Sequence, residues 1–133
     1  MFRNQSNDRS GVAATEFAIC LPVLMLLLLG TLESCSMIFL KQSLSIAAYE
    51  AGHTALLPNA TDSDIRTAGE GVLTDRRIQN GAIQVLPGGI QSIDEGEYFE
   101  IRVSAPTDAN RILPLSFFGG RQLSASAVFM KEI

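Results

Sequence analysis

The chain has 133 residues, of which 47% are hydrophobic and 18% charged, and its formal net charge is −4. A chain of this length holds one domain of ordinary size, which excludes a large multi-domain enzyme. Residues 58–133 carry 7 Lys and Arg side chains against 10 Asp and Glu. This mildly acidic part lacks the basic patch that nucleic-acid binding requires, so we expect no DNA or RNA partner.

The hydrophobic residues are concentrated near the N-terminus, where no charged residue occurs from Phe17 to Leu32. The longer stretch from Val12 to Leu32 contains one charge, and as an α-helix it would extend about 32 Å, the thickness of the hydrocarbon core of a bilayer. Arg3 and Arg9 precede this stretch and Lys41 follows it, a distribution that favours a cytoplasmic N-terminus. The sequence therefore predicts one membrane span.

The single charge in that stretch is Glu16. An acidic side chain near the centre of a membrane helix costs on the order of 2.5–3.5 kcal/mol. One interpretation places Glu16 at headgroup depth, where water and the helix dipole stabilise it. The other notes a polar leader, Gly11, four small residues from Val12 to Thr15, Glu16 and the aromatic Phe17, an order typical of a cleavage site. A glycine and small residues let a protease approach the backbone closely.

This pattern resembles the type IV prepilin family and, within it, the TadE-like pseudopilins of the Tad (Flp) pilus system. The resemblance continues through Leu21-Pro22, a leucine run and Glu33 to the alanine-rich segment before Pro58. It implies that a prepilin peptidase cuts between Gly11 and Val12. It also implies that Glu16, followed by Phe17, is the glutamate required for assembly.

The resemblance further implies a minor pilin or pseudopilin that is held in the bacterial inner membrane, with its N-terminus cytoplasmic and its head periplasmic. Its partners would be the prepilin peptidase, other pilin or pseudopilin subunits, the inner-membrane assembly platform and the lipid bilayer. Physically, a freed Val12 ammonium and the Glu16 carboxylate of a neighbouring subunit would each be costly in lipid but would compensate one another. Whether the subunit enters the fibre or stays at its base is left open.

Beyond the span, apolar residues recur at intervals of three and four, which predicts an amphipathic helix. Because no strong breaker lies between Pro22 and Pro58, one helix is expected to run from Val12 to Leu57, about 69 Å, with a bend at Pro22. We therefore expect a leader at 1–11, a transmembrane helix at 12–35, a helical stem at 36–57 and a head at 58–133. The predicted stripe contains Met37, Leu40, Leu44, Ala47 or Ala48, Ala51 and Ala55.

The head is predicted to contain a helix and about three antiparallel strands. N-cap residues before Ile65 indicate a helix from Ser63 to Arg77. Alternating apolar residues indicate strands at Ala82–Leu86, Tyr98–Ala105 and Leu123–Lys131. One face of such a sheet is apolar and needs a cover, which the stem can supply. The expected fold class is α+β and pilin-like.

Catalytic and metal-binding patterns are not recognisable, so we expect neither an enzyme nor a cofactor. No Ser/His/Asp or Cys/His arrangement can be assembled around His53, the single histidine. The acidic residues between Asp94 and Glu100 lack the spacing of a calcium loop. Cys20 and Cys35 would lie about 22 Å apart along one helix, too far for an intrachain disulfide, although Cys35 remains a candidate for bridging two subunits.

Two alternatives remain. An uncleaved single-pass anchor for a binding or sensor module would make Gly11 and Glu16 dispensable. A secreted or lipid-anchored protein would use Leu32-Glu33-Ser34-Cys35 as a degenerate lipobox. Glu33 argues against this second alternative, and the apolar run is longer than the 7 to 15 residues of a usual signal peptide.

Overall fold

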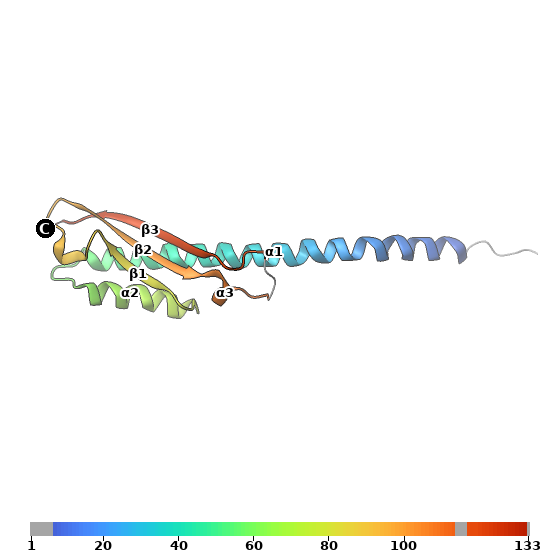
Figure 1. The fold of residues 1–133 in the computed structure, drawn as a ribbon, viewed down its shortest axis with the longest axis horizontal. Helices are drawn as coiled ribbons and strands as arrows, with labels where there is room; N and C mark the ends of the chain where they lie inside the picture. Colours follow the sequence, from blue (N-terminus) through green and yellow to red (C-terminus); the bar gives the residue numbers. More distant parts are fainter. Residues whose placement is uncertain (1–6, 114–116, 133) are drawn as a thin grey trace, which may run out of the picture.

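A long N-terminal helix organises the molecule. The computed structural model describes residues 7–113 and 117–132. Half of helix α1 (Asn7–Ala55) stands alone, and the other half carries a second helix and a three-stranded sheet (Figure 1). The predicted α+β fold, a long helix packed on a small antiparallel sheet, is therefore confirmed.

Helix α1 begins five residues before the predicted start and ends two residues before the predicted end. Residues 1–6 of the expected leader lie outside the described residues, and the leader residues from Asn7 onward are helical. At the other end, the Leu56 and Leu57 N–H groups donate to carbonyls three residues back, at 3.2 and 3.1 Å. This tighter turn closes the helix just before Pro58.

The stem half of α1 buries the predicted apolar stripe. Leu40, Leu44, Ala47, Ala48 and Ala51 have no exposed surface, and Met37 and Ala55 are 8% and 4% exposed. The opposite face is exposed, as predicted. Alanine along the stripe brings the helix axis close to its neighbours, because a short side chain permits a short interaxial distance.

Helix α2 (Asp62–Asp75) runs back along α1 toward the isolated half (Figure 1). A capping box starts it: the Thr61 hydroxyl accepts from the Asp64 N–H, and the Asp64 carboxylate accepts from the Thr61 N–H at 2.9 Å. The hydrogen bonds from the Thr61 side chain and backbone lower the pKa of Asp64 below its ordinary value of 3.8.

A Schellman motif ends α2 two residues earlier than predicted. The Ile78 N–H donates to the Leu73 carbonyl at 2.8 Å, and the Arg77 N–H donates to the Thr74 carbonyl at 3.0 Å. Arg77 has a φ of 57° and so occupies the left-handed position that usually takes glycine.

The sheet has the order β1-β2-β3 and is antiparallel throughout. Its strands are β1 (Ala82–Leu86), β2 (Tyr98–Pro106) and β3 (Gln122–Met130). Each lies within one residue of its predicted bounds. The inward residues of β2 are buried on the side of the sheet that packs against α1, and they are Phe99, Ile101, Val103 and Ala105. The stem thus supplies the cover that the apolar face needs.

Two short elements were not predicted: η1 (Ile90–Ser92) and α3 (Thr107–Asn110). Both are held by hydrogen bonds from distant residues. The Ile90 N–H donates to Asp62 Oδ1 at 2.8 Å, and the Thr107 N–H donates to the Arg121 carbonyl at 2.9 Å. Such tertiary contacts leave no local sequence signal.

Candidate functional site

The residues predicted for processing and assembly lie on the isolated half of α1. Gly11, Val12, Glu16 and Phe17 are all exposed, Val12 by 59% and Phe17 by 62%. An added Cβ at Gly11 would meet nothing within 4 Å. Val12 and Glu16 are one turn apart and therefore share a face of the helix.

The bonding around these residues is local. The Thr15 hydroxyl donates to the Gly11 carbonyl at 2.9 Å. Among the residues that the structure describes, Glu16 forms no hydrogen bond or ion pair. The Glu16 carboxylate is thus available to a partner outside the chain.

The isolated half is apolar and uncovered. Within residues 7–113 and 117–132, α1 is the one helix long and apolar enough to cross a membrane, and the apolar stretch that meets this criterion has none of its residues buried. Leu24, Leu27 and Leu28 are 53%, 62% and 52% exposed. A surface of this kind requires lipid or other apolar helices around it.

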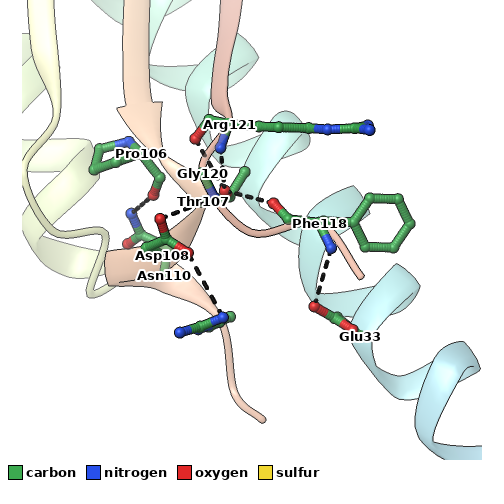
Figure 2. Close-up of polar contacts among 9 residues, drawn as sticks. Glu33, Pro106, Thr107, Asp108, Asn110, Phe118, Gly120 and Arg121 are labelled. Carbon is green, nitrogen blue, oxygen red and sulfur yellow. Dashed lines mark hydrogen bonds and ion pairs between the residues drawn. The ribbon is translucent and has the colours of Figure 1, made fainter. Parts of the chain in front are cut away.

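A second polar site lies where the span meets the head. Glu33 is 1% exposed, and its Oε1 accepts from the Phe118 N–H at 3.4 Å (Figure 2). Its other oxygen, Oε2, is buried and accepts no hydrogen bond from the described residues. A buried acceptor left unsatisfied costs about 1–3 kcal/mol. Burial of this carboxylate therefore lowers the stability of the fold at the junction between the apolar stretch and the head.

Thr107 ties the loop near Glu33 to the sheet. Its hydroxyl lies 2.8 Å from the Phe118 carbonyl and 2.9 Å from the Arg121 carbonyl (Figure 2). Asp108 accepts from the Gly120 N–H at 2.9 Å, and the Asn110 amide donates to the Pro106 carbonyl at 2.8 Å. The turn at 117–120 is therefore fixed from both sides, by α3 and by α1.

Sequence reasoning gave Glu33 no role of its own, although a signal for one was present. Glu33 precedes Met37 by four residues and Leu40 by seven, so it is in phase with the apolar stripe. A charged residue in that phase must be buried when the stripe is covered. Periodicity alone could therefore have identified it.

The remaining chemically reactive side chains are dispersed. Cys20 and Cys35 are both free and exposed. His53 is exposed and packs edge-on against Tyr49, with ring centroids 4.5 Å apart. Asp94 and Glu97 lie in the turn before β2, where the Glu97 N–H donates to the Asp94 carbonyl at 3.2 Å.

In a comparison with known protein families, a family model described as TadE-like protein matches residues 11–53. The matched segment covers α1 almost to its last turn and includes Gly11, Glu16 and Glu33. No curated protein and no solved structure matches the chain. The match and the apolar α1 fit a membrane-anchored, pilin-like protein related to the Tad pilus. The resemblance seen in the N-terminal sequence is thus confirmed, and over residues 11–53 the chain matches the TadE-like family.

Proposed function

We propose that this chain is a minor pilin or pseudopilin of a Tad (Flp) pilus, which a prepilin peptidase processes and which is needed for pilus assembly, adhesion or secretion. Its role is structural, with the N-terminus in the cytoplasm and the head in the periplasm. The observation that carries the proposal is the uncovered apolar half of α1 with the unpaired Glu16 on its surface. Lipid covers this half before assembly, and neighbouring subunits cover it afterwards.

The processing step fits the local geometry. The Gly11–Val12 bond lies in the first turns of α1, and Gly11 has no side chain to obstruct a protease. A bond inside a helix must be unwound before cleavage. Unwinding is cheapest at a helix end, because few hydrogen bonds are lost there and the end residues fray.

The assembly step follows from electrostatics. Cleavage leaves an ammonium group at Val12, one helical turn before the Glu16 carboxylate. Both groups then lie at the edge of the apolar stretch, where an isolated charge is costly. Pairing with the opposite group of a neighbouring subunit removes this cost, so assembly is favoured over the isolated subunit. The assembly platform would bring the subunits together.

N-terminal sequencing of the membrane-extracted protein tests the processing step. We expect the mature sequence Val-Ala-Ala-Thr-Glu-Phe in cells with an active prepilin peptidase, and Met1 retained when the peptidase is deleted. Gly11→Val should block cleavage, whereas Gly30→Ala should not, since Gly30 is another α1 glycine at which an added Cβ would meet nothing within 4 Å. Retention of Met1 in peptidase-positive cells would favour the uncleaved anchor instead.

Charge substitution tests the assembly step. Glu16→Gln keeps the side-chain size but removes the charge, and we expect it to leave membrane insertion and cleavage intact. Copurification with other pilus subunits should fall by about ten-fold or more, because loss of one partner leaves a buried charge unpaired. The matched control is Glu50→Gln on the exposed face of the stem. Normal fibres in the Glu16→Gln strain would overturn the proposed role.

A further inference from the structure

The end of the head nearest the apolar span carries a group of basic side chains. Arg76 and Arg77 follow α2, and Arg111 follows α3. With residues of α1 they line a cavity of about 390 Å³, whose apolar wall includes Leu32 and Ile112. The Arg76 guanidinium lies 5.9 Å from the centre of the Phe39 ring. The cavity therefore has a cationic rim and an apolar wall.

The position of this cavity along α1 corresponds to the bilayer surface. Leu32 is the last residue of the uncharged stretch, and Cys35, also on the cavity wall, is about 5 Å farther along the helix. Each headgroup region of a bilayer is about 5–8 Å thick. The wall of the cavity also reaches Phe39, about 10 Å beyond Leu32, so Arg76 stands at the outer edge of the headgroup layer if α1 spans the membrane.

The charges of the head are separated along its length. The opposite end, near the end of α1, carries the acidic Glu95 and Glu132 together with Lys131. At the membrane end the carboxylates are the buried Glu33, the exposed Asp75, and Asp108, whose Oδ1 lies 3.6 Å from Arg111 Nη1. Two further cations, Lys41 and Arg121, line the adjacent cavity beside α1, and they add to the positive charge at this level. A net-acidic head thus turns its cationic end toward the bilayer.

Arg77 supplies independent support. It adopts a φ of 57°, where a residue other than glycine is strained by about 1–2 kcal/mol. Glycine at this position would end α2 with less strain, but it would remove a guanidinium from the cavity. A strained residue with a long cationic side chain is typical of a functional position.

We propose that this cavity binds an anionic phospholipid of the bilayer that α1 crosses. The phosphodiester faces Arg76, Arg77 and Arg111, and the first acyl carbons lie along Leu32 and Ile112. The bound lipid fixes the head at the membrane surface. This inference rests on α1 spanning the membrane, as in the proposed function, and adds a ligand that the family match does not assign.

The full chain contains no tryptophan, so a single introduced tryptophan can report on its lipid neighbours. Ile112→Trp, a 78% exposed position on the cavity wall, is reconstituted in vesicles of phosphatidylcholine and phosphatidylglycerol in a 3:1 ratio. Two preparations are compared. In one the phosphatidylglycerol is brominated, and in the other an equal mole fraction of the phosphatidylcholine is brominated. We expect brominated phosphatidylglycerol to quench the fluorescence about two- to five-fold more than brominated phosphatidylcholine.

Two double variants of the same reporter protein locate the preference. Arg76→Gln with Arg77→Gln should bring the quenching ratio close to one. Arg66→Gln with Arg102→Gln removes the same charge from α2 and the outer face of the sheet and should leave the ratio unchanged. A quenching ratio near one in the protein that carries Ile112→Trp alone would overturn the proposal, whatever the stability of the double variants.

A second reporter separates this inference from the membrane span itself. Leu24→Trp lies in the middle of the uncharged stretch, and both brominated lipids should quench it equally. Absence of quenching there would mean that α1 does not span the bilayer, so the proposed function would fail together with the lipid site. Equal quenching at Leu24→Trp with no preference at Ile112→Trp would reject the lipid site alone.

Discussion

Glu33 shows how one residue marks the boundary between the two environments of α1. It follows the last residue of the uncharged stretch and is almost completely buried beneath the turn at Phe118. A leucine there would be cheaper to bury, since it would leave no oxygen unsatisfied. The carboxylate instead provides an acceptor for a backbone N–H of the head. It thereby fixes the loop to α1 just beyond the end of the uncharged stretch.

Substitution of Glu33 tests this anchoring. Glu33→Ala removes the acceptor of the Phe118 N–H, so hydrogen exchange of that amide should accelerate by about ten-fold, the effect of losing one modest hydrogen bond. Glu33→Gln keeps an oxygen in place and should retain most of the protection. Exchange measured by mass spectrometry in detergent or nanodiscs checks both. Unchanged exchange in the alanine variant would show that the contact does not hold the loop.

At the scale of secondary-structure elements, Gly52 allows β3 to pack against the stem. A Cβ at this position would lie 1.9 Å from Cε2 of Phe129, so the ring has to move if any side chain is added. That ring stacks on Phe99, with centroids 5.8 Å apart, and approaches Tyr49 at 6.0 Å. The absence of a side chain at Gly52 therefore leaves the space on α1 in which the aromatic cluster forms.

Gly52→Ala should lower the free energy of unfolding of the head by up to about 2 kcal/mol. Overpacking costs about 1–3 kcal/mol, and the gain in helix propensity returns about 1 kcal/mol of it. Gly71→Ala is the matched control: Gly71 lies inside α2 with nothing within 4 Å, so this change should stabilise by about 1 kcal/mol. Urea denaturation followed by circular dichroism measures both. Stabilisation of similar size in the two variants would mean that the Phe129 ring moves aside at no cost in free energy.

The elements of this fold differ in how far their sequence predicts them. The strands were predicted to within one residue because β2 alternates Phe99, Ile101 and Val103 with polar residues, and one face of the sheet is buried. Helix α3 was missed because four residues give no periodicity and Thr107 is held by Arg121, fourteen positions away. The exposed site around Glu16 was located by a motif, whereas the signal for Glu33 is its position in phase with the apolar stripe, which predicts its burial.

At the scale of the whole molecule, the stem and the head form one folding unit although the predicted boundary between them falls at 57/58. The core contains residues of α1, α2 and all three strands in one cluster. Leu40 and Leu44 of the stem are among its largest fully buried side chains. The isolated half of α1 contributes nothing to this core. Two fragments should consequently behave very differently.

A fragment of residues 33–133 should unfold in one cooperative transition, whereas residues 58–133 alone should be unfolded. Burial of a leucine contributes about 1.5–3 kcal/mol, so losing Leu40, Leu44 and the alanine stripe removes an amount comparable to the 5–15 kcal/mol stability of a typical domain. A peptide of residues 33–57 added in trans should restore the structure of 58–133, as measured by circular dichroism. The same peptide with Leu44→Asp on the buried face should fail, and with Ser45→Asp on the exposed face it should succeed. Cooperative unfolding of 58–133 without any peptide would show that the head folds independently and that the stem merely docks onto it.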